Sequence, residues 1–132
     1  MPDKPRFTSS PEKTLQNNHI VPFLEVHGWL VEVMHASYAL KGIPDLYCWH
    51  QGLVTFRWID VKLPKGSDLT KAQCQKWTDW EKRDLGIWIM KEASEEEYLK
   101  LFEPPNWREM WRPRHEKYVR DVKEILDELD DC

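Results

Sequence analysis

The chain has 132 residues, of which 41% are aliphatic, aromatic or Cys and 32% are charged. Its 19 basic and 23 acidic residues give a formal charge of −4, which excludes a uniformly basic coat for binding nucleic acid. The length suits one domain. Eight Trp residues provide large aromatics for a small core or for stacking surfaces. Three Cys residues without a CxxC pair support neither a disulfide framework nor a Cys zinc site.

The N-terminal part predicts a loose arm over residues 1–9 and then a helix. Ser10 is a capping residue, Pro11 suits the first helical position and Glu12 complements the positive end of the helix dipole. Apolar residues follow at helical spacing. Pro22 is expected to kink this helix or to split it.

Three strands are predicted next, over residues 29–34, 45–49 and 53–63, with a hairpin turn at 50–52 between the last two. The third run has apolar residues on both of its faces. This pattern indicates a central strand that is covered on both sides.

Two capping-box patterns predict the helices that follow. The pattern at 70–73 opens a helix that ends near Gly86, and a strand is expected at 87–90. The pattern at 94–97 opens a short helix through Phe102. The order of elements predicts an α/β fold, a mixed sheet flanked by helices.

The segment after Pro104-Pro105 is first basic and then acidic. Residues 107–120 interleave Trp with Arg and Lys, as proteins that bind single-stranded nucleic acid do, although docking on the domain is favoured. Acidic residues dominate from Asp121 onward. An apolar stripe predicts an amphipathic helix, which can be a dimer surface or pack on its own domain: Tyr118, Val122, Ile125 and Leu129.

Two predicted strand ends bring charged residues together. Asp45 begins one strand, while Asp60 and Lys62 end the next and share one face of it. Converging carboxylates suit Mg²⁺ or Mn²⁺, which can activate water. Taken singly, Asp45 can be a turn residue, and Asp60 with Lys62 can be a surface ion pair.

The order of motifs resembles the PD-(D/E)XK nuclease superfamily and, more closely, its VRR-NUC family. That family has Gly-x-Pro-Asp-Leu, then a strand ending in an acid, Val and Lys, then a Pro/Gly loop, then Leu-(Ser/Thr)-x-x-Gln. The matching segments here are 42–46, 59–62, 64–66 and 69–73. The resemblance covers residues 10–102. It implies a restriction-endonuclease-like nuclease domain at 10–103, followed by a C-terminal helical extension at 104–132.

The resemblance also implies roles for the site residues. Asp45 and Asp60 would hold one or two Mg²⁺ or Mn²⁺ ions, with the backbone carbonyl of Val61 as a further ligand. Lys62 would position the attacking water. Gln73 would orient groups in the site, although its place in a capping box explains it equally well.

A glutamate of the first helix completes the site in the resembled family. Glu12 is the preferred match and Glu25 the alternative, because Gly28-Trp29 fits the family's Gly-aromatic pair. The spacing from Glu12 to this pair is longer than in the family, and Pro22 is unusual in this helix. One residue inserted near Pro22 would account for both features.

The resemblance implies a metal-dependent DNA endonuclease, structure-selective for branched DNA such as Holliday junctions. Symmetric cutting of a junction needs two sites, which a homodimer would supply if the C-terminal stripe is a dimer surface rather than packed on its own domain. The alternative is a non-catalytic DNA-binding or regulatory module. The sequence predicts no membrane span, and a cytoplasmic protein of a bacterial or phage-infected cell is expected. Six residues are candidates for DNA contact, although a solvated basic face explains the lysines nearly as well: Lys65, Lys71, Lys76, Arg108, Arg112 and Arg114.

Overall fold

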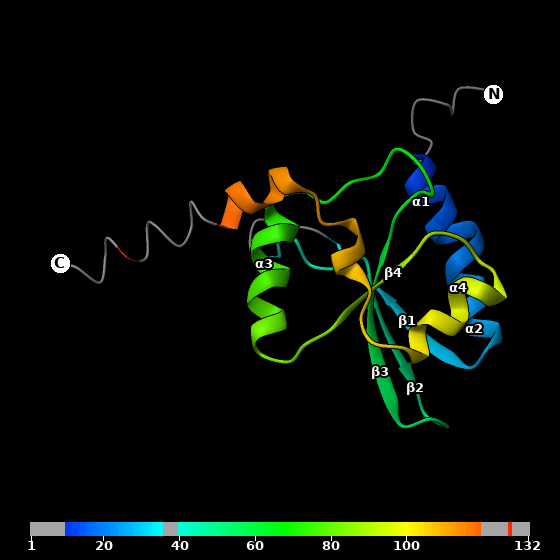
Figure 1. Cartoon of the computed structure of the whole chain (residues 1–132). Coiled ribbons are helices and arrows are strands. Elements are labelled where there is room, and N and C mark those ends of the chain that lie inside the picture. Colours follow the sequence, from blue (N-terminus) through cyan, green and yellow to red (C-terminus); the bar gives the residue numbers. More distant parts are fainter. Residues whose placement is uncertain (1–9, 36–39, 120–126, 128–132) are drawn as a thin grey trace.

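The protein is built around a four-stranded mixed sheet with helices on both faces (Figure 1). The computed structural model describes residues 10–35, 40–119 and 127. The strands lie in the order β1-β2-β3-β4, with β3 and β4 parallel and the other pairs antiparallel. Their bounds are β1 Trp29–Val33, β2 Leu46–His50, β3 Thr55–Val61 and β4 Ile87–Met90. The predicted α/β class, a mixed sheet flanked by helices, is confirmed.

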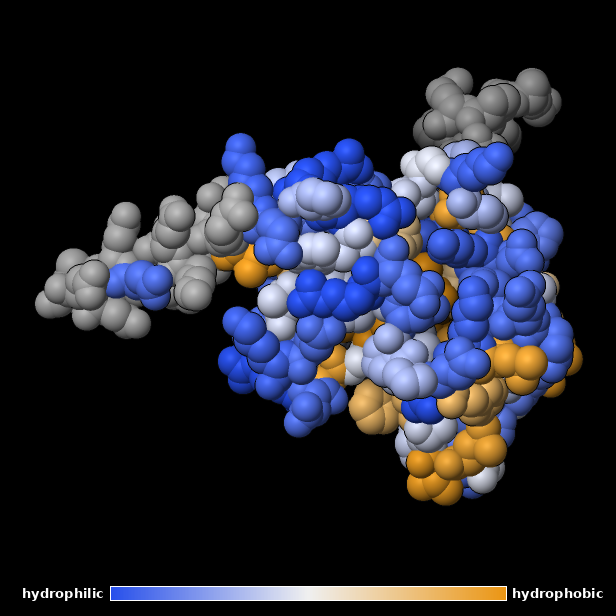
Figure 2. All heavy atoms as spheres, in the orientation of Figure 1, coloured by the Kyte–Doolittle hydropathy of each residue, from blue (hydrophilic) through white to orange (hydrophobic). Residues whose placement is uncertain are grey.

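The β2–β3 hairpin turns later than the sequence predicts. The predicted strand over 53–63 begins only at Thr55, since Leu53 and Val54 belong to the turn. Val54 has φ of +49°, a left-handed backbone conformation that interrupts an extended strand. Both turn residues are exposed, Leu53 to 49% and Val54 to 75%. Figure 2 shows apolar atoms gathered at this tip.

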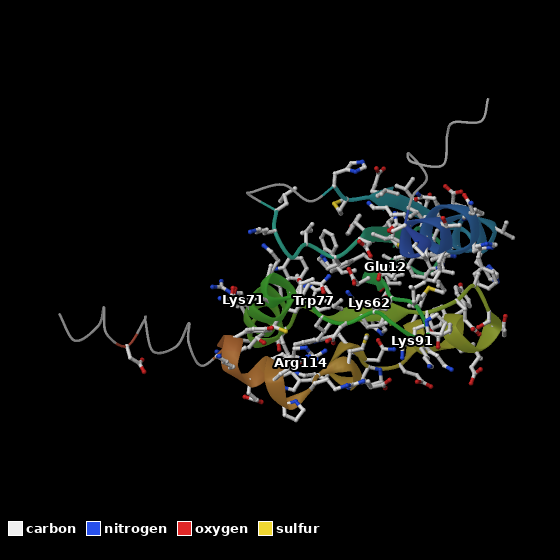
Figure 3. The ribbon with its side chains drawn as sticks, turned by 90° about the horizontal axis from the view of Figure 1, so that it is seen from above. Glu12, Lys62, Lys71, Trp77, Lys91 and Arg114 are labelled. Atoms are coloured by element: carbon white, nitrogen blue, oxygen red, sulfur yellow. The ribbon has the colours of Figure 1, made fainter. Side chains whose placement is uncertain are left out.

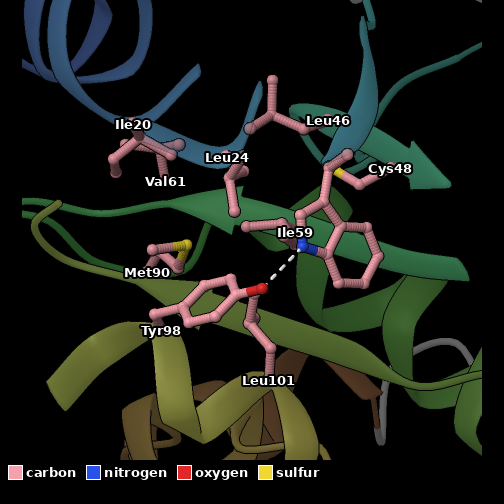
Figure 4. Close-up of a cluster of buried hydrophobic side chains, with 10 residues drawn as sticks. Ile20, Leu24, Leu46, Cys48, Ile59, Val61, Met90, Tyr98 and Leu101 are labelled. Atoms are coloured by element: carbon pink, nitrogen blue, oxygen red, sulfur yellow. Dashed lines mark hydrogen bonds between the residues drawn. The ribbon is translucent and has the colours of Figure 1, made fainter. Parts of the chain in front are cut away.

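One face of the sheet is covered by the N-terminal helix and by the helical segment after β4. The helices are α1 (Pro11–Leu15), η2 (Gln16–Ile20), α2 (Val21–Val26), α4 (Glu95–Leu99) and η3 (Lys100–Phe102). Within this layer the Trp29 indole N–H donates to the Tyr98 hydroxyl at 3.0 Å (Figure 4). The buried residues of this cluster are Ile20, Leu24, Trp29, Leu46, Cys48, Ile59, Val61, Met90, Tyr98 and Leu101.

The predicted break at Pro22 takes the form of a π-helical segment. Residues Gln16–Ile20 are π-helical, and the Val21 N–H donates to the Gln16 carbonyl five residues earlier. Pro22 then lies in the first turn of α2, where its missing N–H costs little. A π turn holds one more residue than an α turn. The helix therefore accommodates an extra residue just before Pro22.

The opposite face is covered by α3 (Lys71–Lys82) and by η4 (Trp107–Met110). The Asn106 side chain accepts from the Ile89 N–H at 2.7 Å, so the chain after Pro105 closes the outer edge of β4. Residues 113–119 are helical. The C-terminal segment docks on the domain, because Trp107 and Met110 are buried among residues of α3 and β4. The buried residues of this cluster are Leu69, Cys74, Trp77, Ile87, Ile89, Trp107 and Met110.

The end of α3 and the capping box of α4 differ from the predicted ones. The helix α3 ends at Lys82 rather than near Gly86. Asp84 adopts φ of +64°, and the Leu85 N–H donates to the Trp80 carbonyl, as in a Schellman motif without glycine. At the start of α4 only half of the capping box forms, because the Glu97 carboxylate accepts from the Lys91 N–H at 2.8 Å instead.

Some expectations fall on residues that the structure leaves undescribed. The predicted arm over residues 1–9 lies outside the described residues, and so do three of the four stripe residues, Val122, Ile125 and Leu129. Among the helices of the described part, none is both long and apolar enough to cross a membrane.

Candidate functional site

Antiparallel pairing brings Asp45 and Asp60 together. Leu46 faces Ile59 across β2 and β3, so Asp45, one residue before β2, meets Asp60 near the end of β3. The Asp45 N–H donates to Asp60 Oδ1 at 3.1 Å, and the Val61 N–H donates to Asp45 Oδ2 at 2.8 Å. Each carboxylate is thus bound by the backbone of the neighbouring strand segment.

Lys62 and Gln73 join the two carboxylates in one cluster of buried and half-buried side chains. Lys62 Nζ lies 3.2 Å from Asp60 Oδ2 and donates to Gln73 Oε1 at 3.0 Å. Gln73 Nε2 donates to both Asp60 oxygens at 3.5 and 3.4 Å. Asp60 is fully buried and Lys62 is 3% exposed. The surface ion pair that the sequence left open is therefore not what forms.

The packing of Gly42 on α3 positions the loop that carries Asp45. The Trp77 indole N–H donates to the Gly42 carbonyl at 2.7 Å. Gly42 has φ of +82°, and a Cβ at this position would lie 2.6 Å from the Ala72 carbonyl oxygen. Only glycine fits here without displacement, because the loop backbone lies directly against the helix backbone.

The two carboxyl groups are costly to ionise where they lie. Burial raises the pKa of Asp60 to about 8, with a further increase from the Asp45 charge and an opposing effect of Lys62. Burial also raises the pKa of Asp45, and the Val61 N–H opposes this increase. A single lysine does not balance the charges of two carboxylates, of which Asp60 is fully buried and Asp45 half-buried. A bound cation would favour their ionised forms.

Glu12 faces a pocket that adjoins this cluster. The pocket has a volume of about 390 Å³ and is lined by Ser10, Pro11, Glu12, Lys62, Leu63, Gly66, Ser67, Asp68, Thr70 and Gln73. Glu12 Oε2 accepts from the Ser67 hydroxyl at 2.5 Å. Figure 3 shows Glu12 and Lys62 near each other. Glu25, the alternative carboxylate, is exposed on α2.

The expected set of three carboxylate ligands is not assembled. Within residues 10–35, 40–119 and 127, no group of three or more His, Cys, Asp and Glu side chains could hold a metal ion. Asp60 is bound by Lys62 and Gln73, while Glu12 is bound by Ser67 on the pocket wall. The donors are nevertheless hard oxygens, which suit Mg²⁺ or Mn²⁺.

The candidate DNA-contacting lysines lie in and after the loop that follows β3. Lys65 and Lys71 are exposed, and Lys76 on α3 is half-buried. Lys71 Nζ lies 6.0 Å from the centre of the Tyr118 ring, so it is near the C-terminal segment. Lys65 and Lys71 remain accessible to a phosphate backbone.

Two of the three candidate arginines, Arg108 and Arg112, have partners on the domain or in their own segment. Arg108 packs between the Trp107 and Trp111 rings at 4.4 and 4.5 Å and pairs with Glu81 at 2.9 Å. Arg112 is exposed and donates to backbone carbonyls of its own segment. Since Trp107 is 1% exposed, the Trp107–Arg108 pair anchors the segment to the domain rather than offering a free stacking surface.

Three residues of the site region were missed by sequence reasoning. Ser67 bridges the Leu63 N–H, at 2.9 Å, to Glu12. Asp68 pairs with Arg114, and His115 Nε2 lies 3.4 Å from Asp68 Oδ1. Nothing in the local pattern around these residues indicates their distant partners.

Comparison of this chain with protein families, with curated proteins and with solved structures finds no match.

Proposed function

We propose that this protein is a divalent-metal-dependent DNA endonuclease with a restriction-endonuclease-like fold, as its resemblance to the VRR-NUC family implies. The observation that carries the proposal is the cluster of Asp45, Asp60, Lys62 and Gln73 at the ends of adjacent strands, in which Asp60 and Lys62 are buried. Buried carboxylates with raised pKa values are costly for a fold unless they serve a site.

The donor set fits a hard divalent cation. Asp45 and Asp60 would hold Mg²⁺ or Mn²⁺, with the Val61 carbonyl as a further ligand and Glu12 as the carboxylate on the pocket side. When bound, the cation supplies charge stabilisation for phosphodiester hydrolysis and activation of water. The negative charge of the whole chain is no obstacle, because a cation held by these carboxylates would offset it where phosphate binds.

The neighbouring amide and lysine side chains would position the attacking water and contact the DNA. Lys62 lines the pocket beside Gln73 and is held by both Gln73 and Asp60, so its ammonium would orient the attacking water and neutralise developing charge. Gln73 fixes that ammonium in place. Lys65 and Lys71, both exposed, would contact the DNA backbone beyond the pocket.

A non-catalytic DNA-binding or regulatory module on the same fold is the second candidate. One observation favours it, since the described residues assemble two carboxylates into the cluster rather than three. In that case the ion pair of Asp60 and Lys62 would be structural. The selectivity for branched DNA and the action as a homodimer belong to the first candidate only.

The test is cleavage of linear, flapped, splayed and four-way DNA by the full chain with Mg²⁺ or Mn²⁺. The variants Asp45→Asn and Asp60→Asn are expected to abolish cleavage. Asp79→Asn is the matched control, because the Asp79 side chain on α3 is 58% exposed. DNA binding is measured alongside for every variant.

Each outcome discriminates between the two candidates. Cleavage by wild type and by Asp79→Asn, lost in both site variants, supports the nuclease. Binding of DNA without cleavage supports the module. Equal cleavage by Asp60→Asn and wild type overturns the assignment of the site.

A further inference from the structure

The loop between β3 and α3 contacts two elements that are distant in the chain. Ser67 donates to Glu12 on α1 at 2.5 Å. The next residue, Asp68, forms an ion pair with Arg114 and lies 3.4 Å from His115 Nε2. Both loop residues line the pocket, so the shape of the pocket depends on where this loop is held.

The His115 ring is oriented toward the loop by its own segment. The Arg112 N–H donates to His115 Nδ1 at 2.8 Å, so the ring proton lies on Nε2. His115 is fully buried, and among the described residues Nε2 has no hydrogen-bond partner of good geometry. Its nearest acidic atom is Asp68 Oδ1. A buried ring nitrogen that lies 3.4 Å from a pocket-lining carboxylate indicates a contact with a positioning role.

The segment that presents Arg114 and His115 is firmly attached to the domain. Trp107 and Met110 are buried in the cluster beneath α3, Arg108 pairs with Glu81, and the Tyr118 carbonyl accepts from Gln75 Nε2 at 3.5 Å. In Figure 3, Arg114 lies on the C-terminal segment, below the helix that carries Lys71 and Trp77.

We propose that residues 107–119 hold the pocket loop in place and that Asp68 is the positioning residue through which they do so. The segment lies outside the part that resembles a nuclease, yet it fixes Asp68. Through the adjacent Ser67 it fixes the hydroxyl that binds Glu12. Burial and the charges of Arg114 and Arg112 lower the pKa of His115, so a neutral ring faces the Asp68–Arg114 pair.

This inference rests on the proposed function only for its effect on cleavage. Its direct readout is hydrogen exchange of the Leu63 amide, which donates to Ser67 Oγ, next to Asp68 in the chain, at 2.9 Å. The variants of the full chain are Asp68→Asn, Arg114→Gln and the double variant. Lys117→Gln is the matched control, since Lys117 is an exposed cationic residue of the same segment.

Exchange of the Leu63 amide is expected to rise about tenfold in Asp68→Asn, which weakens the contacts to both Arg114 and His115. It is expected to rise roughly threefold in Arg114→Gln, since this arginine is largely exposed. The double variant should exchange no faster than Asp68→Asn. If the protein is a nuclease, kcat falls in the same order while the melting temperature stays close to that of wild type.

Unchanged exchange in Asp68→Asn, or an equal increase in Lys117→Gln, overturns the proposal. A protein that cleaves no DNA leaves the exchange measurement decisive, because that readout needs no substrate. Loss of cleavage in Asp68→Asn without faster exchange also overturns it, since Asp68 would then act on the substrate rather than on the loop.

Discussion

Gln73 Oε1 accepts a hydrogen bond from Lys62 Nζ and another from the Thr70 N–H, both at 3.0 Å. The second bond is part of the capping box that begins α3, in which the Thr70 hydroxyl accepts from the Gln73 N–H. One side-chain oxygen therefore both starts a helix and holds the ammonium of the candidate site.

This double role predicts a difference between two variants of the same cap. Gln73→Ala and Thr70→Ala should each lower the free energy of unfolding by about 1 kcal/mol. Gln73→Ala should also reduce cleavage roughly 10- to 100-fold, because it releases Lys62. Thr70→Ala should leave the cleavage rate close to wild type. Urea unfolding and initial cleavage rates measure the two effects, and equal loss of cleavage in both variants would contradict a specific role of Gln73.

The stability of the metal-free protein should fall as pH rises toward 8. Asp60 has a higher pKa in the folded protein, about 8, than its ordinary value of 3.8. Between these values the folded state binds more protons than the unfolded chain, so ionisation favours unfolding. The slope contributed by this group reaches about 1.4 kcal/mol per pH unit. Asp45, whose pKa is also raised, acts in the same direction.

Thermal unfolding from pH 5 to 8.5 in EDTA checks this, with Asp60→Asn as the comparison. As pH increases across this window, the melting temperature of wild type should fall relative to that of Asp60→Asn. Millimolar Mg²⁺ should stabilise wild type more at pH 8 than at pH 5, because the cation binds the ionised carboxylates. Parallel profiles for wild type and variant would show that Asp60 does not titrate as stated.

Glu12 and Glu25 offer a matched pair of carboxylates on the N-terminal helix. Glu12 lines the pocket and accepts from Ser67, whereas Glu25 is exposed. Glu12→Gln should reduce cleavage roughly 10- to 100-fold, and Glu25→Gln should leave it unchanged. Mn²⁺ binding by calorimetry should weaken only in Glu12→Gln. Weaker binding in Glu25→Gln alone would reverse the assignment of the helix carboxylate.

The part of the site that is local in sequence could be predicted. The alternation of β3 places Asp60 and Lys62 on one face, and the hairpin pairing brings Asp45 to Asp60. The capping box at Thr70 fixes where α3 begins. The two-residue alternation of a strand and the residue types of a helix cap act over a few neighbouring positions. A single sequence is therefore enough to predict these features.

The rest depends on contacts between distant segments. Ser67 binds Glu12 across 55 positions, and Asp68 meets His115 through the docking of a C-terminal segment. The π-helical turn at Gln16–Ile20 was indicated only indirectly, by the long spacing from Glu12 to Gly28-Trp29 and by Pro22 within the helix. The left-handed Val54 has no local signal either, since valine favours a strand.

Gly42 and Gly66 both need a left-handed backbone conformation, but only Gly42 also lacks space for a side chain. Both have positive φ, +82° and +90°, but a Cβ at Gly42 would meet the Ala72 carbonyl at 2.6 Å, whereas nothing lies within 4 Å at Gly66. Gly66→Ala should therefore cost only the backbone strain, about 1 kcal/mol. Gly42→Ala should cost at least about 2 kcal/mol more, because the loop must move off α3.

The same displacement should weaken the site. Moving Gly42 strains its carbonyl's bond with the Trp77 indole and shifts Asp45, three residues later, away from the Val61 N–H. Gly42→Ala should thus lose cleavage even at temperatures where it is fully folded, while Gly66→Ala retains it. Urea unfolding and cleavage below the melting transition measure both effects. Equal stability of the two variants would mean that the loop and α3 are not packed backbone to backbone.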